Sequence, residues 1–237
     1  MINTYIALDL ETTGLNPASD RILEIGAVKV IDGQIVGTYE TLVNPGLKIS
    51  PRIEELTGIT DEMAAKGKDT RTAVTELIEF CEDLPLLGHN ILFDYSFVKR
   101  NAVNLNLTFE KEGIDTLKIA RALLPEVESR SLEFLCGYYK IAQERAHRAS
   151  NDAMAAAELY SRMWQQFPES PKEVFAPKPL ICKFKKQSPI TAAQKSYLND
   201  LVKYHKIALE VSVDTLTKNE ASRIIDKIIL ENGRIQR

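Results

Sequence analysis

The spacing of apolar residues along the 237-residue chain changes from the period of strands to the period of helices. Residues 5–8 form an apolar run that predicts a buried strand, and the β-branched segments 22–31 and 35–43 predict two more. Asp32-Gly33 lies between these two segments and is typical of a two-residue hairpin. Three strands are therefore expected before the first long helix.

Helical spacing dominates the next part of the chain. A short helix is expected from Pro51, because Ser50 suits the cap position and proline suits the first turn. Longer helices are expected over residues 70–83, 90–101, 115–124, 131–139 and 150–167, three of them capped by Asn90, Asp115 and Ser131, with short strands at 86–89 and around 114. This order predicts an α/β domain in which helices cover both faces of a mixed sheet.

The pattern changes again beyond residue 167. Five prolines lie among lysines between residues 168 and 190, which predicts a semi-rigid linker. Capping boxes then begin at Thr191 and Thr217, and each is followed by the apolar stripe of a helix. We therefore expect an α/β domain over residues 1–167, a linker over 168–190 and a small helical module over 191–237.

Charge divides the chain in a similar way. Residues 1–166 carry 17 Lys and Arg against 25 Asp and Glu, whereas residues 167–237 carry 13 against 8, and the whole chain has a net charge of −3. A basic tail behind an acidic domain is suited to a polyanion such as DNA. Two alternatives stay open: the basic residues only solvate the linker and the helices, or the apolar stripes dock a protein partner or the α/β domain itself.

Other features of the composition bear on location. We find no run long and apolar enough to span a membrane, and Asp9 interrupts the apolar stretch that a secretory signal would need. Cys81, Cys136 and Cys182 are odd in number and widely spaced, which argues against a disulfide framework or a zinc site. We expect a protein of the reducing cytoplasm with no membrane partner.

Two carboxylates follow the first predicted strand. Asp9 and Glu11 lie two residues apart, so their side chains point to the same face of a strand. Anions this close repel each other unless a cation lies between them, and oxygen ligands suit Mg²⁺ or Mn²⁺. A strand that ends in a solvated acidic turn explains the same residues without a metal.

Two further acids and a histidine add to this pair. Asp94 and Asp152 each fall in the first turn of a predicted helix, where the helix dipole alone favours an acid. His147 lies five residues before Asp152, in the loop from which it can lean over the same site. Together these residues match what phosphodiester hydrolysis requires: carboxylates that hold two metal ions, and a base that takes a proton from the attacking water.

Three segments carry a resemblance to a known family. They are Asp9-Leu-Glu11-Thr-Thr-Gly, His89-Asn-Ile-Leu-Phe-Asp94 and His147-Arg-Ala-Ser-Asn-Asp152. In this order they resemble the three exonuclease motifs of the DEDD family, and the histidine is typical of its DEDDh, DnaQ-like branch. That branch includes the epsilon proofreading subunit and the exonuclease domain of bacterial DNA polymerase III. The resemblance covers roughly residues 3–166 and implies an RNase H-like fold, with a five-stranded sheet whose second strand is antiparallel to the rest.

The resemblance also implies residue roles. Asp9 would bridge two divalent ions, Mg²⁺ or Mn²⁺, and Glu11 and Asp152 would complete the site of the ion that binds the attacking water. Asp94 would serve the second ion, and His147 would be the general base. Contacts with the terminal nucleotide would come from Thr12, Leu15, Leu56, Thr57 and Phe93. The chain departs from the family at Thr57, where histidine is frequent.

The implied activity is a metal-dependent 3′→5′ exonuclease that removes nucleoside monophosphates from DNA 3′ ends, on single strands or frayed ends. We find no polymerase signature in the tail, so a proofreading role would require a DNA polymerase in trans. Two alternatives stay open. One is a 3′→5′ exoribonuclease of the same fold, and the other is a catalytically inactive module that binds nucleic acid or a polymerase.

Overall fold

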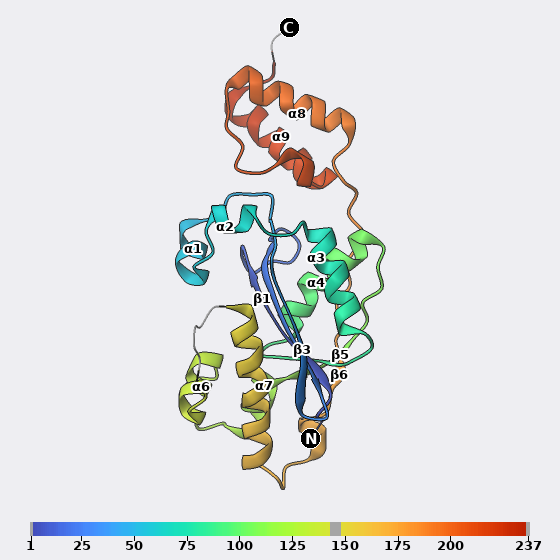
Figure 1. Cartoon of the computed structure of the whole chain (residues 1–237). Coiled ribbons are helices and arrows are strands. Elements are labelled where there is room, and N and C mark those ends of the chain that lie inside the picture. Colours follow the sequence, from blue (N-terminus) through green and yellow to red (C-terminus); the bar gives the residue numbers. More distant parts are fainter. Residues whose placement is uncertain (1, 143–147, 236–237) are drawn as a thin grey trace. The chain divides into compact units, whose positions relative to one another are not determined.

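The computed structural model describes residues 2–142 and 148–235, which divide into two units (Figure 1). The first unit comprises Met1–Pro45 and Ile49–Phe184, and the second comprises Gly46–Lys48 and Lys185–Arg237. The chain therefore leaves the first unit for three residues after its third strand and then returns to it.

A mixed sheet forms the centre of the first unit. Its strands, in chain order, are β1 (Tyr5–Thr12), β2 (Ile22–Ile31), β3 (Gln34–Leu42), β4 (Leu86–Gly88), β5 (Glu112–Asp115) and β6 (Lys178–Pro179). In the described residues they lie in the order β3-β2-β1-β4-β5-β6. Among the first five, β2 alone runs antiparallel to its neighbours, as the resemblance to the DEDD family implied. The sheet gains a sixth strand, β6, which pairs antiparallel with β5 in a segment expected to be linker.

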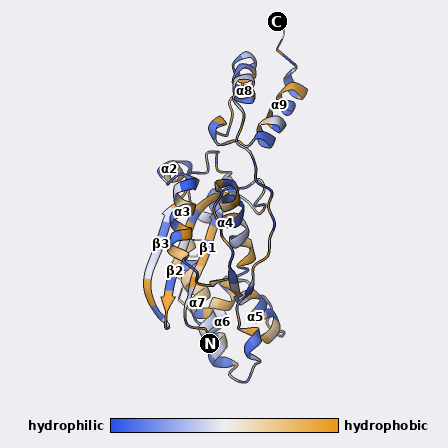
Figure 2. Cartoon of the chain, turned by 90° about the vertical axis from the view of Figure 1, so that its right-hand side faces the viewer, coloured by the Kyte–Doolittle hydropathy of each residue, from blue (hydrophilic) through white to orange (hydrophobic). Residues whose placement is uncertain are grey.

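Helices cover both faces of this sheet, which confirms the predicted α/β architecture (Figure 1). Ile6, Leu8 and Leu10 of β1 pack in one core cluster with α3 (Thr70–Cys81) and α4 (Leu92–Leu105). The alternate residues Tyr5 and Ala7 pack in the other, which is completed by α5 (Thr116–Leu123), α6 (Leu132–Tyr139) and α7 (Ala149–Gln166). In Figure 2 the hydrophobic colouring of β1 reflects its burial between these two layers.

Local caps start most helices where the sequence placed them. Ser50 and Ser131 accept hydrogen bonds from the first turns of α1 (Pro51–Thr57) and α6, and Asp115 does so for α5. The short α2 (Asp61–Ala65) was not predicted. The predicted Asn90 cap is wrong: α4 begins at Leu92, while Asn90 adopts a left-handed conformation with φ 68°.

The second unit is a helical pair. It contains α8 (Ala192–His205), a 3-10 turn (Val213–Thr215) and α9 (Lys218–Asn232). Both helices begin with the predicted capping boxes, at Thr191 and Thr217. Their apolar stripes face each other around Leu198, Leu201 and Ile225. The inserted residues 46–48 add a bridge between Leu47 and Val211, so this small core uses a piece of distant sequence.

The first unit continues beyond the expected boundary at residue 167. The next segment forms a 3-10 turn (Lys172–Val174), and its Phe175 is only 1% exposed in the core beneath α7. Further along, β6 pairs with β5, and Leu180 is buried in the opposite core cluster. Phe175 and Leu180 are therefore anchored in the first unit, while most residues around them are exposed or half-buried, and the units divide after Phe184.

Two expectations about composition can be compared with the structure. Cys81, Cys136 and Cys182 are free cysteines; the first two are buried and Cys182 is half-buried. Over residues 2–142 and 148–235, none of the helices combines the length and the apolar character that crossing a bilayer requires.

The packing of residues 170–184 yields a prediction about truncation. A protein ending at residue 184 should melt near the temperature of the first unit in the full chain. One ending at residue 169 should be destabilised by at least about 3 kcal/mol, because it lacks the buried Phe175 and Leu180. Urea unfolding followed by circular dichroism measures the difference. Phe175→Ala in the full chain is the matched control and should lose about 3–5 kcal/mol, whereas equal stability of the two truncations would contradict the assignment.

Candidate active site

The central strand β1 presents Asp9 and Glu11 toward α7. Asp9 pairs with Gly26 of β2, and Glu11 pairs with Glu24 two residues further along. The odd-numbered residues Tyr5 and Ala7 of the same strand pack in the α7 core cluster, so the two acids continue that face. Asp9 is half-buried and Glu11 is 9% exposed, which places two carboxylates at the edge of the core.

The first turn of α7 brings a third carboxylate to this pair. Oxygen atoms of Asp9, Glu11 and Asp152 all lie within 4.8 Å of one another. The backbone N–H of Asp152 donates to the Arg148 carbonyl oxygen at 3.0 Å, so the residue belongs to the first helical turn as predicted. Three acids that are up to 143 positions apart in the sequence therefore share one site.

Asp94 approaches from the other side of β1. It lies in the first turn of α4, is 3% exposed, and accepts a hydrogen bond of 3.1 Å on Oδ1 from the Leu10 backbone N–H. This bond joins Asp94 to the strand between Asp9 and Glu11. Its charge also raises the pKa of Asp9, second only to burial. The fourth predicted acid is thus adjacent to the three-carboxylate cluster.

Burial and mutual repulsion hold these acids toward their protonated forms. Burial is the main cause of the raised pKa of Asp9, and the charges of Asp94, Asp152 and Glu11 add to it. Burial, followed by Asp152 and Glu24, raises the pKa of Glu11 to about 7, while Arg148 opposes the shift. Burial likewise raises the pKa of Asp94, although two backbone N–H groups work against it.

The donor set fits a hard divalent cation. It consists of carboxylate oxygens alone, which Mg²⁺ and Mn²⁺ prefer, and a cation would offset the repulsion that raises these pKa values. The acidic turn considered as the alternative in the sequence does not match the structure, because Glu11 and Asp152 are buried and not solvated.

The predicted substrate contacts occupy different environments. Leu15 is 84% exposed and Leu56 is 50% exposed, so both present apolar side chains to solvent. Phe93 is half-buried, with its ring 5.0 Å from that of Phe97. The hydroxyl of Thr12 donates to the Gly14 carbonyl oxygen, and that of buried Thr57 to the Ile53 carbonyl oxygen. Their roles toward a nucleotide stay predictions, and His147 lies outside the described residues.

His89, from the second motif, and Asp115, the predicted helix cap, have structural roles. The ring nitrogens of His89 lie 2.9 Å from Thr116 Oγ1 and 2.8 Å from the Arg130 carbonyl oxygen, and burial lowers its pKa. Asp115 accepts hydrogen bonds from the backbone N–H groups of Asn90, Leu117 and Lys118, which confirms it as a helix cap. These contacts join the ends of β4 and β5 to α5.

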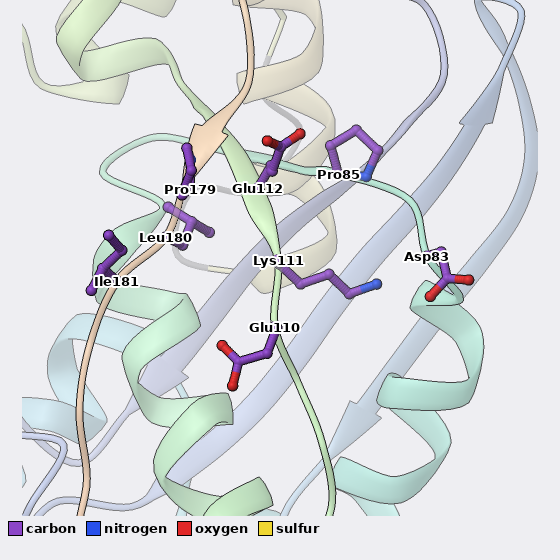
Figure 3. Close-up of a pocket in the computed structure, with 8 residues that line it drawn as sticks. All are labelled: Asp83, Pro85, Glu110, Lys111, Glu112, Pro179, Leu180 and Ile181. Atoms are coloured by element: carbon purple, nitrogen blue, oxygen red, sulfur yellow. The ribbon is translucent and has the colours of Figure 1, made fainter.

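A separate cavity of about 380 Å³ opens at the β5–β6 edge (Figure 3). It is lined by Asp83, Pro85, Glu110, Lys111, Glu112, Pro179, Leu180 and Ile181. β1, β4 and β5 run parallel to one another. Pro85 and Glu112 lie at the starts of β4 and β5, whereas Asp9 and Glu11 lie in the second half of β1. The cavity therefore lies at the other end of the sheet and contains none of the four acids.

Two residues beside the acidic cluster, Glu24 and Arg148, were not predicted from the sequence. Glu24 of β2 is 1% exposed and forms an ion pair with Arg148, which stands at the cap position of α7. The available signal was an acid within the otherwise apolar segment 22–28, since charged residues are rarely buried without a partner. The partner, 124 positions away, could not be identified from spacing.

Comparison with known proteins identifies the class of protein to which this fold belongs, the exonucleases. An exonuclease family model, that of RNase T, matches residues 6–160. The DNA polymerase III PolC-type proteins of Caldanaerobacter subterraneus and Thermotoga petrophila are 38% and 41% identical to the chain over 165 and 160 residues. These matches include 70% and 67% of this chain but only 12% of each relative.

Solved structures share the fold. Exonuclease X in complex with 5′ overhanging duplex DNA is 27% identical, with a TM-score of 0.57 over 72% of this chain and 97% of that one. E. coli Exonuclease I in complex with a dT13 oligonucleotide is 22% identical, with a TM-score of 0.63 over 71% of this chain and 42% of that one. The chain belongs to the RNase T exonuclease family, as the DEDD motifs implied.

The raised pKa of Glu11 predicts how the metal-free protein responds to pH. A carboxyl whose pKa rises from 4.5 to about 7 on folding costs stability progressively between these values, and fully above pH 7. Glu11→Gln should therefore stabilise the protein in EDTA at pH 8 by about 1–3 kcal/mol, and hardly at pH 4.5.

Urea unfolding at both pH values measures this effect. Glu79→Gln, at an exposed position of α3, is the matched control and should change stability little at either pH. An effect of Glu11→Gln that is the same at both pH values would contradict the predicted protonation of the cluster.

Proposed function

We propose that the chain is a metal-dependent 3′→5′ exonuclease that removes nucleoside monophosphates from DNA 3′ ends. The observation that carries the proposal is the convergence of Asp9, Glu11 and Asp152 within 4.8 Å, with Asp94 bonded to the strand between the first two. The polarity comes from the resemblance of the three motifs to the DEDDh branch.

Two divalent cations, when bound, would stabilise the attacking and leaving oxygens of an in-line phosphodiester hydrolysis. Asp9, Glu11 and Asp152 would hold one of them, and Asp9 with Asp94 the other. The carboxylates of the chain would supply the negative charge that binds the cations, and the burial of Glu11, Asp94 and Asp152 would strengthen that attraction. His147 would take the proton of the attacking water, because a histidine titrates near neutral pH.

DNA as substrate is supported by the relatives. Exonuclease X was solved with 5′ overhanging duplex DNA, and the PolC-type relatives are named as DNA polymerases. We extend this to single-stranded DNA or frayed 3′ ends for this chain. The exposed Leu15 and Leu56 are suited to contact with a terminal base, and Thr12, Thr57 and Phe93 would line the same pocket.

The relatives also support a place in replication or repair. Because the PolC-type proteins combine a polymerase name with a region similar to this chain, we propose that the enzyme proofreads for a DNA polymerase subunit supplied in trans. Such a partnership would place it in the cytoplasm with the chromosome.

The activity is tested with 5′-labelled DNA and RNA oligonucleotides of one sequence. DNA should be shortened stepwise from its 3′ end with Mg²⁺ or Mn²⁺, and the reaction should stop in EDTA. Asp9→Ala should lower kcat by more than about 10³-fold without unfolding, because it removes one of several repelling anions. Preferential cleavage of RNA would favour the exoribonuclease, and full activity of Asp9→Ala would exclude the proposed site.

The base is tested with His147→Ala. Its kcat should fall by about 10²–10⁴-fold while its affinity for Mn²⁺ stays near that of the wild type. The acidic limb of the pH–rate profile should also flatten, since that limb would report protonation of the histidine. Loss of Mn²⁺ binding with an unaltered pH profile would make His147 a ligand in place of a base.

A further inference from the structure

The first turn of α7 is capped by a residue from another element. Arg148 occupies the cap position, and its side chain accepts no hydrogen bond from the helix. Instead, Glu24 of β2 accepts a hydrogen bond of 3.0 Å on Oε2 from the backbone N–H of Ala149. A carboxylate at a helix N-terminus offsets an unpaired donor and interacts favourably with the helix dipole. The strand β2 therefore holds the helix that carries Asp152.

The same carboxylate is held by Arg148. The guanidinium donates from Nε to Oε1 and Oε2 of Glu24 at 3.0 and 3.1 Å, and from Nη2 to Oε1 at 2.6 Å. Glu24 is 1% exposed, so its charge depends on these donors. Guanidinium and carboxylate groups in such a two-point contact fix orientation as well as distance. The Glu24 side chain is thus locked in the position that caps α7.

The backbone of Arg148 also contacts Asp152. Its carbonyl oxygen accepts hydrogen bonds from the backbone N–H groups of Asn151 and Asp152, at 2.9 and 3.0 Å. One residue therefore binds β2 with its side chain and the metal-ligand candidate with its main chain. A displacement of Arg148 would move the start of the helical turn that presents the Asp152 carboxylate.

Gly26 allows the helix to approach this closely. It pairs with Asp9 across β1 and β2, and a Cβ atom at this position would lie 2.1 Å from the Ala149 carbonyl carbon. The backbone of the α7 terminus therefore touches β2 directly opposite Asp9. Close packing alone does not fix the rotation of a helix about its axis. The Glu24 carboxylate adds this constraint, because it accepts a hydrogen bond from the backbone N–H of Ala149 in the first turn.

We propose that Glu24 and Arg148 are a positioning pair, which sets the first turn of α7 against β1 and thereby directs the Asp152 carboxylate toward Asp9 and Glu11. Neither residue needs to touch a metal ion or the substrate. The inference rests on the proposed function, in which Asp152 is a metal ligand. Residues that orient metal ligands typically change metal affinity or activity by about 10–100-fold when they are replaced.

The first test measures Mn²⁺ binding by electron paramagnetic resonance in Glu24→Gln, Glu24→Ala and Arg148→Lys. The Kd for Mn²⁺ should rise by about 10-fold in Glu24→Gln and Arg148→Lys and up to about 100-fold in Glu24→Ala. The kcat on a DNA oligonucleotide should fall in the same order, with little change in KM, and saturating Mn²⁺ should restore part of it. Glu24→Gln keeps one acceptor oxygen, so it should lose less Mn²⁺ affinity and less kcat than Glu24→Ala.

The matched control is Glu40→Gln. Glu40 also contacts Arg148, at 3.4 Å, but its side chain is 48% exposed, so the same acid-to-amide change should leave Mn²⁺ affinity unaltered. If Glu24→Ala does not fold, Glu24→Gln and Arg148→Lys still decide the question. Wild-type Mn²⁺ affinity and kcat in either folded variant would overturn the proposal.

A second readout separates the positioning pair from the proposed function. Amide hydrogen exchange at Ala149 and Asp152, measured by NMR in EDTA, needs neither metal nor substrate. It should accelerate at least about 10-fold in Glu24→Gln, because the cap of the first turn is weakened. A wild-type protein that neither binds Mn²⁺ nor cleaves DNA would refute the nuclease proposal alone, whereas unchanged exchange in the variants would refute the positioning pair.

Discussion

The carboxylates of Asp9, Glu11, Asp94 and Asp152 repel one another, and the fold of the first unit holds them together against that repulsion. The raised pKa values of Asp9, Glu11 and Asp94 record the cost, since burial and neighbouring charge both favour the neutral acids. Such an arrangement persists only where well-packed surroundings impose it. A cation at this place would convert the same repulsion into binding energy.

The sheet provides that support because β1 lies between two independent core layers. One layer contains α4 and brings Asp94 to the strand, and the other contains α7 and brings Asp152. Each acid is therefore anchored by apolar packing that does not depend on the charge it carries. The Glu24–Arg148 pair also orients the first turn of α7, because it bonds to that turn and not to the apolar residues further along the helix.

Residues 170–184 show how the sheet is completed beyond the part that the family model covers. Phe175 fills the core below α7, where its ring lies 5.0 Å from that of Trp164, and its carbonyl oxygen accepts a hydrogen bond from the Tyr160 hydroxyl. Leu180 is buried in the opposite layer, where it fills the space beside Gly113. A proline-rich composition is compatible with this role, because an edge strand does not need every backbone donor.

Local patterns in the sequence determined much of this protein. Period-two spacing put Asp9 and Glu11 on one face of a strand, and the caps at Ser50, Ser131, Thr191 and Thr217 set helix starts, because such contacts span only a few residues. The three motifs also identified the family.

Tertiary structure decided the rest. Spacing could not show that Asp94 would bond to Leu10, that Glu24 would pair with Arg148, or that Phe175 and Leu180 would enter the two cores. Each of these contacts joins distant segments through space, and its strength depends on burial that no local window contains. The left-handed Asn90 illustrates the same limit, since its backbone N–H is held by Asp115 from the neighbouring strand and not by its own helix.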